Sequence, residues 1–265
     1  MESNDLHRFS VALDLPGMLS VSLILFAWQQ FSAQLGCLAS LLFIVPVWGA
    51  ISLSLCEGAL LRRRVFVNQY LEPGSLLARW LSRGLILLLW QGVKGMVLTI
   101  ALFIALLTAN QALWVLLLAD IPVVLILTGV LTRVLHTQIK SQVLQPLVRV
   151  WVQPINSLLL WLLSVCLMLL SEREDFGAIA WSDAVGYSAS QVAAQCDFFQ
   201  VLGRAAAVWD TSAWWAAQHL MAGVEKPWLA LVGWLSFLSM FAASLVTAWA
   251  FSRALLGVIS KPWRI

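Results

Sequence analysis

Long apolar runs alternate with short polar segments along the whole chain. The runs pair into predicted helical hairpins at about 12–57, 85–131 and 155–252, and polar turns such as ANQ (109–111) join their halves. A helix needs about 20 mostly apolar residues to cross the hydrocarbon core of a bilayer. The pattern therefore predicts an all-α polytopic integral membrane helical bundle, with about six transmembrane helices arranged as three hairpins.

Basic residues gather outside the apolar runs, in segments 58–84 and 132–154 and in a basic tail at 253–265. Mixed basic and apolar residues are typical of amphipathic helices that lie in the headgroup zone. Cytoplasmic loops retain lysine and arginine during membrane insertion. We therefore predict that both termini are cytoplasmic in the inner membrane of a bacterium. The first segment supplies candidate partner or membrane-interface residues: Arg62, Arg63, Arg64, Arg79 and Arg83.

The segment 172–227, inside the third hairpin, has a different character. It contains seven acidic and three basic residues, and it is rich in tryptophan. Tryptophan favours the membrane interface because its ring is apolar and its N–H needs a polar partner. We predict a periplasmic cap of one or two helices, with Trp209, Trp214 and Trp215 as further interface candidates. Trp28 and Trp114 are assigned to the same outer tryptophan belt.

Composition agrees with lipid as the main solvent of the chain, because 61% of the 265 residues are hydrophobic and only 11% are charged. Soluble domains carry about 25% charged residues. The sequence has no basic run interleaved with aromatic residues, so we expect no nucleic-acid partner. The four cysteines form no CxxC pair, and core filling is the preferred interpretation. The alternative is a disulfide from Cys196 to either Cys37 or Cys166.

Two charges lie inside the second predicted hairpin, Lys94 and Asp120. Side chains of a helix lean toward its own N-terminus, so these two lean apart and no direct salt bridge is expected. Lys94 is interpreted chiefly as a snorkelling lysine. A carboxylate at the depth of Asp120 must be protonated, paired with another helix or exposed to a water-filled cavity. Both are candidate intramembrane functional residues, although a structural polar contact is the preferred interpretation of Asp120.

Catalytic and metal-binding patterns are missing from the sequence. The three histidines are far apart, and neither HExxH nor a Walker motif is present. We therefore expect no cofactor, no metal and no enzymatic activity. The preferred hypothesis is a non-catalytic subunit that anchors or assembles a multiprotein membrane complex for secretion, transfer or envelope functions, with lipids and other subunits as partners. The alternative is a transporter or channel subunit that uses Asp120, with Lys94, for ion, proton or substrate passage.

Overall fold

The structure, a computed structural model, describes residues 2–70, 85–171, 175–220 and 227–259. Regular secondary structure in these ranges is entirely helical. Five helices are long and apolar enough to cross a membrane, and the apolar part of the first helix, Leu15–Phe31, is shorter. The predicted all-helical, multi-pass membrane fold is confirmed at this level. The helices are α1 (Glu2–Phe31), α2 (Cys37–Tyr70), α4 (Leu85–Leu107), α5 (Gln111–Leu135), α6 (Ser141–Leu170), α7 (Trp181–Gln191), α8 (Asp197–Leu220) and α9 (Pro227–Ile259).

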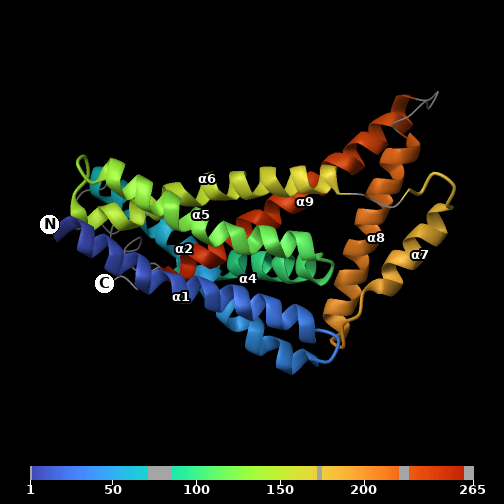
Figure 1. The fold of residues 1–265 in the computed structure, drawn as a ribbon, viewed down its shortest axis with the longest axis horizontal. Helices are drawn as coiled ribbons and strands as arrows, with labels where there is room; N and C mark the ends of the chain where they lie inside the picture. The colour runs from blue at the N-terminus through green and yellow to red at the C-terminus, as the bar shows by residue number, and fades with distance from the viewer. Residues whose placement is uncertain (1, 71–84, 172–174, 221–226, 260–265) are drawn as a thin grey trace.

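Helices α1, α2, α4, α5, α6 and α9 run roughly along the long axis of the molecule, and α8 crosses one end of them with α7 beside it (Figure 1). We call this the cap end, and we call α7 and α8 the cap. The turns that join α1 to α2 and α4 to α5 also lie at the cap end. The position of the turn between α4 and α5 is set by Asn110. Its side chain caps α5 by accepting a hydrogen bond from the backbone N–H of Leu113 at 2.8 Å. Helix α1 begins at the opposite end, and α9 ends in that half of the bundle.

Helix α9 is the central helix of the bundle. Its last turns are mostly buried, with Phe251, Ala254 and Leu255 at 0% exposure. It packs against α1, α2, α4, α6 and α8. Gly257 allows the closest approach, since a Cβ atom at this position would collide with the backbone carbonyl of Ala50 in α2. Small residues allow membrane helices to pack at such short range.

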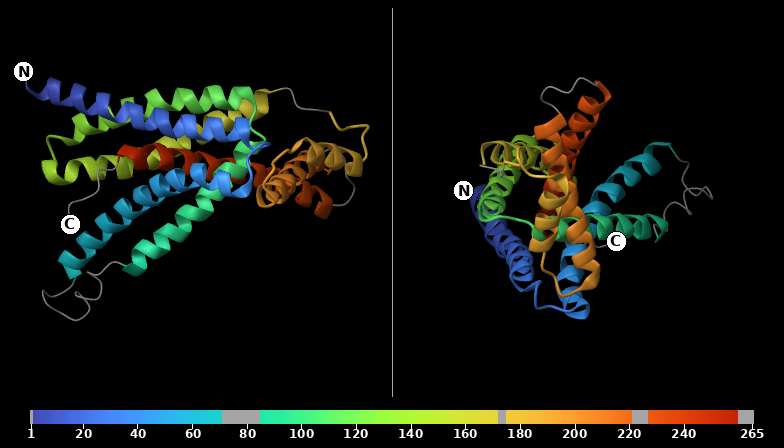
Figure 2. Two further views of the ribbon diagram at one scale, coloured as in Figure 1. Left: turned by 90° about the horizontal axis from the view of Figure 1, so that it is seen from below. Right: turned by 90° about the vertical axis from the view of Figure 1, so that its right-hand side faces the viewer.

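Helices α2 and α4 form a pair that diverges from the other long helices toward the opposite end (Figure 2). The indole N–H of Trp48 in α2 donates to the carbonyl of Gly92 in α4 at 2.9 Å. One turn further along α4, Gly95 lies directly against Ser52. The pair is therefore held together by its own contacts along the flank of the bundle.

The helices run past three of the predicted boundaries. Helix α2 continues to Tyr70, through much of the predicted interfacial segment 58–84. Helix α6 runs unbroken from Ser141 to Leu170, through Pro146 and Pro154, so it joins part of the predicted segment 132–154 to the span that follows. Helix α9 continues to Ile259, past the predicted start of the tail at residue 253. In these stretches, Arg149 and Arg253 are bonded inside the bundle.

Aromatic residues fill the core at the cap end. The ring of Trp28 lies 4.6 Å from that of Phe103 and 5.4 Å from that of Phe199, centroid to centroid, which joins α1, α4 and α8. Trp28 is 1% exposed and Trp114 is 5% exposed, so at this end of the molecule both side chains face the protein core. The indole N–H of Trp114 donates to the side chain of Gln29, which satisfies it inside the protein.

Candidate functional site

Helix α6 carries a stripe of polar side chains on the face that it turns toward the bundle. Arg149, Gln153, Asn156 and Ser157 recur at spacings of three and four residues, so they share one helical face. Gln153, Asn156 and Ser157 are at most 6% exposed. Each of these four side chains has a hydrogen-bond partner, and most of the partners lie on other helices. The stripe contributes to three separate hydrogen-bonded groups between α2, α5, α6 and α9, which we together call the polar network.

Asp120 lies at the level of this network that is nearest the cap end. From the rise of an α-helix, it lies roughly 15 Å along α5 from Asn110 and the cap end. Asp120 is 4% exposed, and its Oδ2 accepts a hydrogen bond from Asn156 Nδ2 at 2.9 Å. The same Nδ2 donates to Ser252 Oγ at 3.2 Å. The carboxylate is therefore held by the neutral amide of Asn156 in α6, and that amide also contacts Ser252 in α9.

Arg253 occupies the next level. Its Nη1 donates to the carbonyl and hydroxyl oxygens of Ser54, at 3.2 and 3.3 Å. Its Nη2 donates to Gln153 Oε1 at 3.0 Å, and Gln153 donates in turn to Ser157 at 3.0 Å. The Nε atom of Arg253 and the Oδ1 atom of Asn156 are buried without a hydrogen-bond partner. These two atoms are the unsatisfied positions of the network.

The level nearest the opposite end is an ion pair between Arg149 and Glu57 of α2. Arg149 Nε donates to both carboxylate oxygens, at 3.0 and 3.1 Å, and Nη2 also binds Glu57. Arg149 Nη1 donates to the carbonyl of Ile259 at 3.3 Å, at the end of α9. The two side chains are 10% and 6% exposed. A buried pair with this many hydrogen bonds links three helices at one point.

Lys94 lies apart from the network. It is on the exposed face of α4, and its ammonium lies 5.2 Å from the ring centroid of Trp90, one turn back toward the start of the helix. This is the snorkelling direction expected for a lysine on this helix. Lys94 and Asp120 therefore do not form one site, and of the two sequence candidates the structure places only Asp120 inside the polar network.

Several members of the network were not singled out from the sequence: Ser54, Glu57, Arg149, Gln153, Asn156, Ser252 and Arg253. The sequence does contain one signal for the α6 members, which is their helical spacing. This spacing places their polar side chains on one face of a helix and is not expected in a loop. Glu57 is also the only acid in the basic stretch 57–64. What the sequence does not contain is which helix faces α6, and that decides whether a polar stripe contacts headgroups or other helices.

The basic candidates of the first interfacial segment are only partly described. Arg62 is exposed and Arg63 is half-buried, both on α2 beyond the ion pair. Arg64 lies in α2, but its side chain is outside the described residues, as are Arg79 and Arg83 entirely.

The three tryptophan candidates all lie on α8, and each contacts another part of the cap end. The N–H of Trp209 donates to Ser239 of α9 at 3.1 Å. The ring of Trp214 packs against Phe237 of α9 at 6.3 Å, centroid to centroid. The N–H of Trp215 donates to the carbonyl of Ile179 at 3.1 Å, just before α7. These side chains join the cap to α9 and join its parts to each other.

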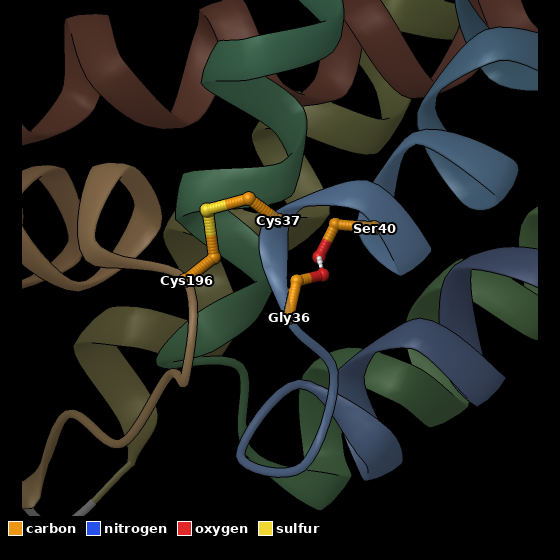
Figure 3. Close-up of a disulfide and its surroundings, with 4 residues drawn as sticks. All are labelled: Gly36, Cys37, Ser40 and Cys196. Atoms are coloured by element: carbon orange, nitrogen blue, oxygen red, sulfur yellow. Dashed lines mark hydrogen bonds between the residues drawn. A yellow bond between two sulfur atoms is a disulfide. The ribbon is translucent and has the colours of Figure 1, made fainter.

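A disulfide between Cys37 and Cys196 fixes the cap to the bundle (Figure 3). Cys37 begins α2, and Cys196 directly precedes α8, 159 residues later. The first turn of α2 beside the disulfide is closed by Ser40, whose hydroxyl donates to the carbonyl of Gly36 at 3.2 Å. The bond to Cys37 decides between the two partners considered for Cys196, and Cys56 and Cys166 are free.

A cavity of about 480 Å³ lies between α7, α8 and the turn from α4 to α5. Its lining is mixed, with Tyr187, Ser188, Thr211 and Trp214 among the walls. The hydroxyls of Ser188 and Thr211 are 2.5 Å apart and join the two cap helices across it. Among the described residues, no group of three or more histidine, cysteine, aspartate or glutamate side chains could hold a metal ion. No family model, curated protein or solved structure matches this chain.

Proposed function

We propose that this protein is a non-catalytic, multi-pass subunit of the bacterial cytoplasmic membrane that anchors or assembles a multiprotein complex. The observation that carries the proposal is the attachment of the cap. A disulfide, an aromatic cluster and two tryptophan contacts hold α8 on the bundle, and a third tryptophan, Trp215, joins α8 to the segment before α7. A surface fixed in this way suits the docking of other subunits, because no ordering of the cap is needed when a partner binds.

The proposed topology has six spans, with α1 as the shortest, and both termini on the cytoplasmic side. Disulfides persist in oxidising compartments such as the periplasm, which supports an outer location for the cap end. Basic residues at the opposite end support a cytoplasmic location there. They include the exposed Arg62 and Lys140.

The proposed docking surface is an apolar stripe along α8. Positions 198, 201, 205 and 209 recur at helical spacing and all four are exposed. Phe198, Val201 and Trp209 have exposed fractions of 51%, 65% and 57%. Aromatic residues are enriched where interfaces gain most of their binding energy. We call these four positions the cap stripe.

The test is purification of the tagged full-length protein from its native membrane in a mild detergent, as wild type and as Val201→Glu. A glutamate in the cap stripe places a charge in the interface core. We expect stoichiometric partner subunits with the wild type and about tenfold less of them with the variant, which corresponds to about 1.4 kcal/mol. Mass spectrometry of the purified material measures both.

Ile179→Glu is the matched control, because Ile179 is also an exposed apolar residue of the cap end, at 42%. It should keep the partners. Equal recovery of partners with Val201→Glu and wild type would contradict docking at the cap stripe. Wild-type protein that purifies alone under all mild conditions would contradict the complex itself.

The second candidate function is passage of protons or cations by way of Asp120. The observation that favours it is the pair of unsatisfied buried atoms, Asn156 Oδ1 and Arg253 Nε, in the same network as an intramembrane carboxylate. Ionisable residues inside membranes often mark proton or ion pathways. The network is otherwise closed by hydrogen bonds, which favours the assembly hypothesis.

Asp120→Asn separates the two functions. The amide keeps the size of the side chain and its acceptor oxygen for Asn156, but it cannot exchange a proton at neutral pH. The assembly hypothesis expects unchanged partner recovery and unchanged proton permeability in proteoliposomes. A wild-type proton or cation flux that Asp120→Asn abolishes, in a protein that still assembles, would favour transport.

A further inference from the structure

We infer that the cavity between α7, α8 and the turn from α4 to α5 binds a small organic ammonium cation. Its volume of about 480 Å³ lies within the range of small-molecule sites, which is about 300–1,000 Å³. The cavity lies inside the cap end, so this inference does not depend on the docking of partner subunits proposed above.

The walls of the cavity come from one face of each cap helix. Positions 207, 210, 211 and 214 of α8 recur at spacings of three and four residues, and all four line the cavity. Tyr187 and Gln191, one turn apart on α7, line the other side. Thr211 and Phe176 are 8% and 7% exposed and form the inner part of the lining, whereas Asp210 and Tyr187 are exposed at its mouth.

The sign of the charge at the cavity is negative. Asp210 is the one charged side chain among the described residues that line it. Two helices also end at the cavity, α4 at Leu107 and α7 at Gln191. A helix C-terminus carries roughly half a unit of negative charge. The start of α5 lies close by, but its partial positive charge is capped by Asn110. A carboxylate and two helix ends therefore all favour a cation.

The wider surroundings of the cavity have the same sign. The part of the cap that the structure describes, 175–220, contains four aspartates and one arginine. A cleft lined by one sign of charge raises the local concentration of the opposite ion. The cap therefore attracts cations to the mouth of the cavity.

Three aromatic residues in the lining, Phe176, Tyr187 and Trp214, favour an organic cation over a metal ion. An ammonium group is attracted to the face of an aromatic ring, and quaternary ammonium compounds are recognised in this way. Asp210 and Trp214 are one turn apart on the same face of α8, so a carboxylate and a ring are neighbours in the wall. Among the described residues, no acidic, histidine or cysteine cluster could hold a metal ion instead.

Saturation-transfer NMR of the full-length protein in a maltoside detergent tests this inference. The probes are choline and its neutral carbon isostere, dimethylbutanol, at constant ionic strength. We expect wild type to bind choline about tenfold more tightly than the alcohol. Asp210→Asn should remove this difference and leave binding of the alcohol unchanged. Asp183→Asn is the matched control and should behave as wild type, because Asp183 is another exposed aspartate of the cap and does not line the cavity.

A second pair of variants tests the aromatic wall at Tyr187, whose side chain is 55% exposed, so the fold should tolerate both changes. Tyr187→Leu removes the ring and should weaken choline binding about threefold, whereas Tyr187→Phe keeps the ring and should retain it. The inference is overturned if wild type binds both probes equally, or if either Asp210→Asn or Tyr187→Leu binds choline as wild type does. Equal loss in Asp183→Asn and Asp210→Asn would also overturn it, since the charge of the whole cap would then be responsible.

Discussion

At the scale of single residues, the strongest constraint is the buried ion pair of Arg149 with Glu57. Each side chain is nearly inaccessible, and Arg149 would be left as a buried charge without its carboxylate if Glu57 were removed. Breaking a buried pair costs more than replacing both members, because the remaining charge keeps its desolvation penalty.

Glu57→Ala is therefore expected to lower the free energy of unfolding by about 3–5 kcal/mol. Titration of the purified protein from mild detergent into dodecyl sulfate measures this loss. The double variant Glu57→Leu with Arg149→Met removes both charges and should be less destabilised than Glu57→Ala. A double variant as unstable as the single one would show that the pair is not what stabilises this level of the bundle.

Gly257 sets a second residue-scale constraint, at the crossing of α9 with α2. Gly257→Ala brings a methyl group into the carbonyl of Ala50, and overpacking of this kind costs about 1–3 kcal/mol. Gly49→Ala, one residue from Ala50, is the control, because nothing lies within 4 Å of the added atom. In a helix this control substitution should stabilise the protein by about 0.4–1 kcal/mol. Thermal unfolding in detergent, followed by circular dichroism, compares the two, and equal melting temperatures would contradict the close crossing.

At the scale of elements, the cap depends on the link between α2 and α8. The closed loop between Cys37 and Cys196 is long, and loss of a native disulfide typically costs about 2–5 kcal/mol. Replacing both cysteines by serine should make the cap sensitive to protease under conditions where wild type resists. Cys166→Ser, at a free and exposed cysteine, should leave the resistance unchanged.

Thiol counting checks the same link directly. A maleimide that reacts with denatured wild-type protein should label two cysteines before reduction and four after it, because the chain has four cysteines and one disulfide. Four labelled thiols before reduction would exclude the disulfide in the native membrane.

Element boundaries show where sequence is informative about this fold. The apolar runs and Asn110 locate the α4–α5 hairpin, since hydrophobic length and an N-cap are local properties. The start of α6 cannot be predicted from such local properties. Arg149 in an apolar stretch resembles an interfacial residue until the position of Glu57, 92 residues earlier in the chain, is known.

The candidate site is only partly visible in sequence for the same reason. Asp120 is recognisable because any carboxylate at that depth is exceptional. Its partners Asn156 and Ser252 are common residues, and only the packing of α5, α6 and α9 brings them together. Lys94 is equally conspicuous, yet its contacts are with Trp90 and the outside of the bundle.

At the scale of the whole molecule, the proposed orientation predicts which surfaces are accessible from each side. In a background without Cys56 and Cys166, Ser182→Cys should react with a membrane-impermeant maleimide in intact cells with a permeabilised outer membrane. Gln138→Cys, in the turn before α6, should react only after the cytoplasmic membrane is opened. Both positions are exposed, so a difference in labelling reports the side of the membrane. The reverse pattern would invert the topology.

The central place of α9 bears on the order in which the protein is made. Of the described helices, α9 is the last to leave the ribosome, yet its final turns occupy the middle of the bundle. Until then Asn156 lacks Ser252, Gln153 lacks Arg253, and the wall of α2 at Ala50 faces no Gly257. A chain that stops before residue 227 therefore lacks these contacts, and we expect membrane proteases to degrade it faster than the full-length chain.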